Sequence, residues 1–393
     1  MAAILVPFVL LLLSGTSNVW GGVVGINYGQ IADNLPAPER VVGLLQSIGI
    51  KKARLYDADP RVLKAFANSG IEFVVGLDNS YVGNMTDPAK AVEWVKENVE
   101  AYLPGTNITS IAVGNEVYTG NDTALMANLV PAMQNVHAAL VSLGLEGAIN
   151  VLTAHSSGIL GSSYPPSAGA FKPELTVFLR PLLDFHKQTG SPFLINAYPY
   201  FAYKADPDNI PLDYVLFQPN EGQVDGGSNL RYTNMLHAQI DSVYSAISAL
   251  GYENLPVQVS ETGWPSQGDP DEVGATFENA RLYNGNLLRL LAQNQGTPMK
   301  PSVSLDAYVF ALFNENLKTG ETSERNYGLF KPDGTPAYDL GLHGSLSGSN
   351  NVSYTAAAAV AKGTRYHMFF LPLCLQVVLS CICPFILGEL LTY

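Results

Sequence analysis

The chain has 393 residues, of which 47% are hydrophobic and 14% charged, and its net charge is −13. This composition predicts a thick apolar core and excludes an intrinsically disordered chain. Because the basic residues form no cluster along the sequence, nucleic acid is not an expected partner.

The chain begins with a short apolar run, Ile4 to Leu13, and small and polar residues follow as far as Gly22. This order is typical of a secretory signal peptide, although no basic side chain precedes the apolar run. We therefore expect residues 1–21 to be a signal peptide and the protein to be secreted. A buried N-terminal helix is the alternative interpretation.

Between Val23 and Leu342, short apolar runs rich in β-branched residues alternate with amphipathic stretches. Strands are expected at 23–28, 52–56, 73–77, 110–113, 149–153, 193–197, 256–259 and 307–312. Helices are expected at 38–47, 60–68, 88–102, 125–143, 175–187, 235–250 and 276–293. Proline opens several of these helices, and a glycine ends five of them, at positions 49, 70, 144, 190 and 251.

Eight strands alternating with helices predict an α/β protein with a single (β/α)8 TIM barrel over residues 22–342. A doubly wound open sheet is the rival architecture. It would favour a phosphate-binding first loop, and Gly25-Ile-Asn-Tyr-Gly29 lacks the G-x-G-x-x-G spacing. The long irregular segment Phe201 to Tyr232 follows the sixth strand, so it is expected to form a wall of the active-site groove.

After the barrel, residues 343–367 form a spacer rich in Ser, Gly and Ala, and residues 368–393 form an apolar tail. An apolar tail that reaches the terminus with no basic residue after it is typical of a GPI-attachment signal, which is removed. Glu389, Pro372 and Pro384 interrupt the tail, so a retained membrane span or an aberrant tail is the alternative.

Two glutamates each end an apolar run that is expected to be a barrel strand, the fourth for Glu116 and the seventh for Glu261. Polar residues at the carboxyl ends of barrel strands point into the active site. Two carboxylates facing one another across a groove are the usual means of cleaving a glycosidic bond. Other strand ends offer further polar residues for the same site, namely Tyr28, Asp57, Asp78, Asn115, His155, Asn196, Tyr198 and Glu315.

The sequence offers little for metal or thiol chemistry. The three cysteines all lie in the tail, at 374, 381 and 383, and the six histidines show no spacing typical of metal ligands. We therefore expect no metal and no cofactor.

The motifs of residues 23–342 resemble the plant β-1,3-glucanases of glycoside hydrolase family seventeen. The most specific of them are Ala112-Val-Gly-Asn-Glu-Val117 and Val259-Ser-Glu-Thr-Gly-Trp-Pro-Ser266. Five shorter motifs accompany these two: Gly25-Ile-Asn-Tyr-Gly29, Arg54-Leu-Tyr-Asp57, Asn196-Ala-Tyr-Pro-Tyr200, Phe313-Asn-Glu-Asn316 and Glu324-Arg-Asn-Tyr-Gly-Leu-Phe330. The chain resembles the GPI-anchored type, without a cysteine-rich carbohydrate-binding appendix.

The resemblance implies a retaining double displacement in which Glu116 is the acid/base and Glu261 the nucleophile. The charge of Glu261 is expected to raise the pKa of Glu116 so that Glu116 stays protonated. Asn115 would bind the sugar 2-hydroxyl, and Tyr198 would orient Glu261. The rings of Tyr28 and Trp264 would offer faces to sugar rings, and Asn196, Glu315, Lys318 and Glu324 would also bind substrate.

Two roles are open for Glu324, because the resemblance also offers the residue at this position as the acid. We favour Glu116, which ends a strand beside Asn115. An ion pair of Glu324 with Lys318 or Arg325 is as well supported by the sequence as direct catalysis.

The expected activity is endo-hydrolysis of a β-1,3-glucan polysaccharide by a monomer at the outer face of the plasma membrane and in the cell wall. A mixed-linkage β-1,3;1,4-glucanase and a catalytically silent glucan-binding protein are the alternatives. Four Asn-x-Ser/Thr sequons, at Asn84, Asn107, Asn121 and Asn351, predict N-glycosylation of a secreted chain.

Overall fold

The computed structural model describes residues 24–340. The expected signal peptide at 1–21, the spacer at 343–367, the tail at 368–393 and the sequon at Asn351 lie outside the described residues. Within residues 24–340, no helix is both long enough and apolar enough to cross a membrane.

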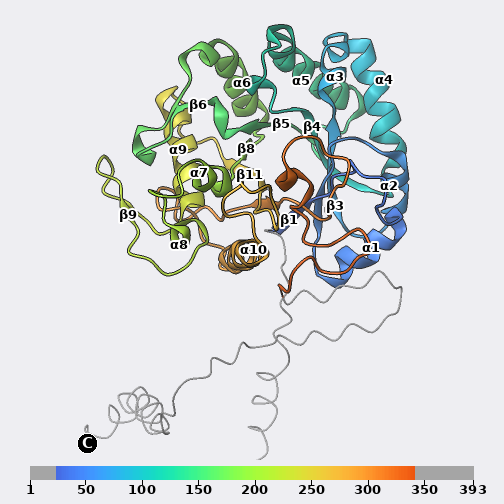
Figure 1. Ribbon diagram of the computed structural model, residues 1–393. Coiled ribbons are helices and arrows are strands. Elements are labelled where there is room, and N and C mark those ends of the chain that lie inside the picture. Colours follow the sequence, from blue (N-terminus) through green and yellow to red (C-terminus); the bar gives the residue numbers. More distant parts are fainter. Residues whose placement is uncertain (1–23, 341–393) are drawn as a thin grey trace, which may run out of the picture. The chain divides into compact units, whose positions relative to one another are not determined.

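Eight parallel strands form a closed barrel in the order β1-β12-β11-β8-β5-β4-β3-β2, with helices around it (Figure 1). The strands are β1 (Val24–Asn27), β2 (Lys52–Arg54), β3 (Glu72–Leu77), β4 (Asn107–Asn115), β5 (Asn150–Ser156), β8 (Phe193–Asn196), β11 (Val257–Thr262) and β12 (Ala307–Val309). Their order confirms the predicted (β/α)8 barrel, and in chain order β4 is the fourth strand and β11 the seventh.

The α-helices are α1 (Pro38–Ser47), α2 (Pro60–Ala65), α3 (Asn79–Val82), α4 (Pro88–Asn98), α5 (Thr123–Leu143), α6 (Thr176–Thr189), α7 (Pro199–Ala205), α8 (Leu212–Val215), α9 (Met235–Ala249) and α10 (Phe277–Leu291). Aspartates 59, 78, 87 and 122 cap α2, α3, α4 and α5 by accepting backbone N–H groups of the first turn. The glycines that were expected to end helices, at 49, 70, 144, 190 and 251, all have positive φ, which only glycine adopts at little cost.

The interior of the barrel changes from apolar to polar along its length. Alternate residues of each strand face into the barrel. Where one strand directs a large ring inward, the facing residue of the adjacent strand must be small. A Cβ on Gly25 would lie 2.3 Å from the Tyr308 ring, so glycine there makes room for that ring beside Val74 and Ala112. One inward step further along β1, Asn27 begins the polar end of the barrel, where it donates to the carbonyl of Ser260.

The segment 201–232 is more ordered than the sequence predicted. It holds most of α7, all of α8 and a small antiparallel pair, β9 (Gln223–Val224) with β10 (Arg231–Tyr232). A second antiparallel pair, β6 (Leu160–Ser162) with β7 (Ala170–Phe171), follows β5. Both pairs are additions to the loops between barrel strands and their helices.

Candidate active site

A cavity of about 630 Å³ opens at the carboxyl ends of the barrel strands. Its lining contains six carboxylates and one lysine, so it is strongly acidic. The lining residues are Tyr28, Gly29, Gln30, Ile31, Tyr56, Asp57, Asp78, Asn115, Glu116, Tyr198, Phe201, Glu261, Phe310, Glu315, Lys318, Glu324 and Tyr327. Phe201 is the one lining residue from the segment 201–232, so of the predicted groove wall only the start of this segment lines the cavity.

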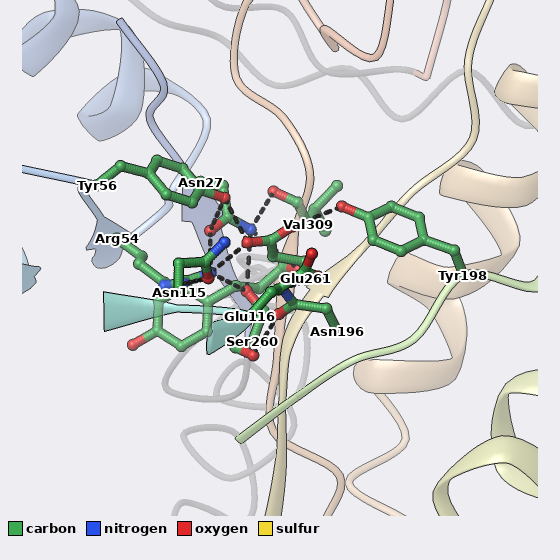
Figure 2. A network of polar contacts seen from close by, with 11 residues as sticks. Asn27, Arg54, Tyr56, Asn115, Glu116, Asn196, Tyr198, Ser260, Glu261 and Val309 are labelled. Atoms are coloured by element: carbon green, nitrogen blue, oxygen red, sulfur yellow. Dashed lines mark hydrogen bonds and ion pairs between the residues drawn. The ribbon is translucent and has the colours of Figure 1, made fainter. Parts of the chain in front are cut away.

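Glu261 is held by three donors (Figure 2). Arg54 Nη1 lies 2.7 Å and the Tyr56 hydroxyl 2.8 Å from Oε1 of Glu261. The Tyr198 hydroxyl donates to Oε2 at 2.8 Å, so the expectation that Tyr198 orients Glu261 agrees with the geometry. Burial, with the charge of Glu261 adding to it, raises the pKa of both tyrosines well above the usual value, so both hydroxyls remain protonated donors.

Arg54 is the central cation of the site, and its side chain is only 2% exposed. Besides Glu261, it donates from Nη2 to Oδ1 of Asn115 at 2.8 Å, and its guanidinium lies 4.8 Å from the centre of the Tyr56 ring. A buried charge is stable only when it is paired and hydrogen-bonded. Sequence reasoning gave Arg54 and Tyr56 no role, although Arg54 ends a strand, where the carboxylates of the predicted site were also expected.

Glu116 follows directly after β4 with its backbone in the left-handed region, at φ 54° and ψ 28°. A residue other than glycine in this region is strained, and such strain is concentrated at functional sites. Its backbone N–H donates to the carbonyl of Ala154 at 2.8 Å, which fixes the turn. The turn places the carboxylate of Glu116 in the cavity beside Asn196, whose Nδ2 donates to Oε1 at 2.8 Å (Figure 2).

The pKa of Glu116 is raised above the usual value for a glutamate. Burial is the main cause and the negative charge of Glu261 the second, while the hydrogen bond from Asn196 and the charge of Arg54 act in the opposite direction. The predicted direction is thus confirmed, but the sequence argument named the smaller of the two causes.

Asn115 lines the cavity, as expected of a substrate-binding residue. Because its side-chain oxygen accepts from Arg54, the amide Nδ2 is the group of Asn115 that can donate to a substrate. Asn196, in contrast, was expected to bind substrate and is 2% exposed. Its oxygen accepts from Ser260 Oγ at 2.6 Å while its nitrogen holds Glu116, so both ends of its amide are engaged by protein.

The two aromatic side chains that were expected to offer faces to sugar rings are both buried. Trp264 is 0% exposed, packs against Tyr200 and Tyr283, and donates from Nε1 to the carbonyl of Gly274, so its ring is not available to a sugar. Tyr28 borders the cavity but is 1% exposed, and its ring packs against Phe66 and Phe313.

His155 was expected at the strand end facing the site, but it is fully buried between the rings of Tyr118 and Phe193. Burial, together with the nearby His186, lowers its pKa to about 3, so it is neutral. A neutral histidine stacked between aromatic rings acts here as part of the core.

Lys318 and Glu324 form an ion pair, with Nζ 3.1 Å from Oε2, and both line the cavity. Lys318 Nζ also lies 4.5 Å from the centre of the Phe310 ring. Of the two readings of Glu324, the structure contains the ion pair with Lys318. Arg325 instead donates to the backbone carbonyls of Lys318 and Gly320.

Glu315 is 4% exposed at the cavity wall, where Oε1 accepts the N–H of Ile31 at 2.8 Å. Burial raises the pKa of Glu315, against the opposing effects of that hydrogen bond and of Lys318. Elsewhere, the sequon asparagines Asn84, Asn107 and Asn121 are all exposed, as glycosylation requires. Among residues 24–340, no group of three or more His, Cys, Asp or Glu side chains is arranged to hold a metal ion.

Comparison with known proteins places this geometry in a family. The family described as glycosyl hydrolases family 17 matches residues 24–342. The chain belongs to this family. Among curated relatives, it is 60% identical to "Glucan endo-1,3-beta-glucosidase 11" of Arabidopsis thaliana over 81% of this chain and 75% of that protein. It is 56% identical to "Glucan endo-1,3-beta-glucosidase 14" of the same plant over 90% of each chain.

Two solved structures extend the family 17 likeness to the fold. The "beta-1,3-glucanase and allergen of Cryptomeria japonica pollen" CJP38 superimposes with a TM-score of 0.77 at 43% identity, covering 81% of this chain and 98% of that one. A structure from a study of "two plant beta-glucan endohydrolases with distinct substrate specificities" gives a TM-score of 0.74 at 40% identity, covering 80% and 99%.

Proposed function

We propose that this family 17 member is an endo-β-1,3-glucanase that cleaves glucosidic bonds within a β-1,3-glucan chain by a retaining double displacement. The observation that carries the proposal is the unequal environment of the two strand-end glutamates. Glu261 accepts three hydrogen bonds, one of them from a buried arginine, and Glu116 accepts one from a neutral amide. The names of the relatives supply the linkage.

In the first step, the Glu261 carboxylate attacks the anomeric carbon while Glu116 donates its proton to the departing glycosidic oxygen. A covalent glycosyl ester forms on Glu261, and the shorter glucan leaves with its new hydroxyl. Arg54 and the two tyrosines hold the Glu261 carboxylate in place before the attack. The retaining mechanism requires the two carboxyl groups to be about 5–5.5 Å apart.

In the second step, water attacks the same carbon and the ester bond to Glu261 breaks. With the charge of Glu261 neutralised in the ester, the carboxylate of Glu116 takes the proton of the water. Two inversions leave the β configuration at the new reducing end. Proton NMR early in the digestion should show the β anomer first, and an initial build-up of the α anomer would contradict the mechanism.

The linkage is tested by digesting laminarin, lichenan and cellulose side by side and sizing the products. We expect rapid release of short oligosaccharides from laminarin and none from cellulose. A rate on lichenan equal to that on laminarin would favour the mixed-linkage alternative. The comparison is needed since a structural relative at 40% identity comes from a study of two endohydrolases with distinct substrate specificities. Binding of laminarin without any hydrolysis would favour the silent glucan-binding alternative.

We also propose that the protein is secreted and held at the cell surface by a GPI anchor that replaces the tail. Three exposed sequons and the apolar runs at both ends of the chain support the proposal. Phosphatidylinositol-specific phospholipase C should release the protein from intact membranes. Detection of residues 368–393 in the mature protein by mass spectrometry would favour a membrane span instead.

A further inference from the structure

Another buried carboxylate, Glu272, lies behind the wall of the cavity in the loop 263–276, which follows β11. Its side chain is 0% exposed and it does not line the cavity. It therefore cannot touch a substrate held there. A buried carboxylate is costly unless its oxygens are paired and hydrogen-bonded, so its contacts show what it holds in place.

The contacts of Glu272 connect the loop after β11 with residue Ser323 and with helix α7. Its Oε2 accepts the backbone N–H of Ser323 at 2.9 Å and that of Asp269 at 2.8 Å. Its Oε1 lies 3.4 Å from Nζ of Lys204, on α7, and Lys204 also pairs with Glu321.

A neighbouring carboxylate repeats the same connection. Asp269 accepts the N–H of Thr322 at 3.0 Å and its hydroxyl at 2.6 Å. The loop after β11 thus binds two successive N–H groups, of Thr322 and Ser323, in the 3₁₀ helix η8 (Thr322–Arg325). The next residue is Glu324, whose side chain lines the cavity and pairs with Lys318.

We propose that Glu272 is a positioning residue of the hydrolase: it fixes η8 on the loop that follows β11 and thereby holds the Lys318–Glu324 pair at the wall of the cavity. The inference rests on the proposed function, since it assigns Glu272 to that reaction. Lys318 and Glu324 act on the substrate side, and Glu272 acts only through them.

The charge of Glu272 is a stable part of this arrangement. Burial by itself would raise its pKa, but the hydrogen bonds from Ser323 and Asp269 and the charge of Lys204 outweigh burial and lower the pKa to about 2. Glu272 is therefore ionised wherever the enzyme is folded at ordinary pH. The substitution Glu272→Gln keeps its shape but presents an NH₂ group in place of one acceptor oxygen, so Lys204 or the two N–H donors lose a partner.

The position of Glu324 has a second consequence, which provides a readout. Four groups act on the Glu116 carboxyl: Glu261 and Glu324 raise its pKa after the main effect of burial, whereas Asn196 and Arg54 lower it. If η8 moves and takes Glu324 away, the pKa of Glu116 falls. The alkaline limb of the dependence of kcat/KM on pH then shifts to lower pH.

The first experiment compares Glu272→Gln with a matched control, Asp225→Asn, on laminarin. Asp225 is also a buried carboxylate with a pKa lowered to about 2. It joins two loops by accepting the backbone N–H groups of Ser167 and Gly227, and none of these three residues lines the cavity. Both variants should melt at a lower temperature than the wild type. Only Glu272→Gln should lower kcat/KM, on the order of tenfold, because displacing groups that hold a substrate by about 1 Å costs up to 10²-fold.

The second experiment is a double-mutant cycle with Glu324→Gln. If Glu272 acts through Glu324, each single variant shifts the alkaline limb to lower pH, and Glu272→Gln adds less than about twofold in kcat/KM once Glu324 is changed. Additive effects of the two substitutions, an unshifted alkaline limb in Glu272→Gln, or an equal loss of kcat/KM in Asp225→Asn would each overturn the proposal.

A measurement without substrate separates this inference from the proposed function. Amide hydrogen exchange in residues 320–326 should be faster in Glu272→Gln than in the wild type, and unchanged in Asp225→Asn. Unchanged exchange in Glu272→Gln would overturn the positioning role even in an active enzyme. If exchange is faster in Glu272→Gln but the wild type itself leaves laminarin intact, the connection to η8 holds and the proposed function is wrong.

Discussion

The surroundings of Glu261 and those of Glu116 differ although the two carboxylates share one cavity. Glu261 is 6% exposed and accepts hydrogen bonds from a guanidinium and two tyrosine hydroxyls. Glu116 meets only the amide of Asn196, and burial raises its pKa. The difference fits the roles proposed for them, nucleophile for Glu261 with its three donors and acid for Glu116 with one.

Replacing the better-supported carboxylate should have the largest effect. In Glu261→Gln the attacking oxygen is lost while the shape is kept, so turnover should fall to background. Binding of a laminari-oligosaccharide should persist, as measured by calorimetry. Circular dichroism checks that the barrel is folded. Substantial hydrolysis by the purified variant would contradict the assignment of Glu261 as nucleophile.

The Glu116→Gln substitution should slow cleavage of laminarin by about 10²–10⁴-fold, the usual contribution of a general acid. A substrate whose leaving group needs no protonation should be spared in the first step. Azide should then accelerate the second step, because a charged nucleophile needs no general base. The same leaving-group and azide pattern in Glu324→Gln, but not in Glu116→Gln, would move the acid role to Glu324.

The donors around Glu261 can be removed one at a time. Tyr198→Phe deletes the hydroxyl that holds Oε2 and should lower kcat on the order of tenfold, since hydrogen bonds to charged groups contribute about 1.5–3 kcal/mol. Tyr252→Phe is the control, because its hydroxyl donates at 2.7 Å to Asp184, away from the cavity. Equal kcat values for the two variants would mean that Tyr198 does not support the reaction.

The smallest expected effect concerns the pH dependence. The raised pKa of Glu116 should place the alkaline limb of kcat/KM above the range of an ordinary glutamate, with activity lost as pH rises through that pKa. Asn196 stabilises the charged form and lowers this pKa. Asn196→Ala should therefore shift the alkaline limb to higher pH, and a shift to lower pH would contradict the role given to Asn196.

Local patterns in the sequence were sufficient to predict the barrel. Alternation of apolar strands and amphipathic helices, with a glycine after five helices, identified the eight strands and placed Glu116 and Glu261 on the fourth and seventh. The reason is that side-chain direction and helix ends depend on near neighbours in the chain. The carboxyl ends of parallel strands meet at one end of a barrel, so the pairing of the two glutamates followed from their positions.

Tertiary structure decided which neighbours each of those residues has. Arg54 reaches Glu261 and Asn115 across the barrel, and Asn196 turns its amide to Glu116 and Ser260 instead of the substrate. Trp264 is buried because α7 and α10 supply Tyr200 and Tyr283 to cover it. A motif fixes the chemistry of a side chain, but whether that side chain meets solvent, a sugar or another ring depends on the packing of segments far apart in the sequence.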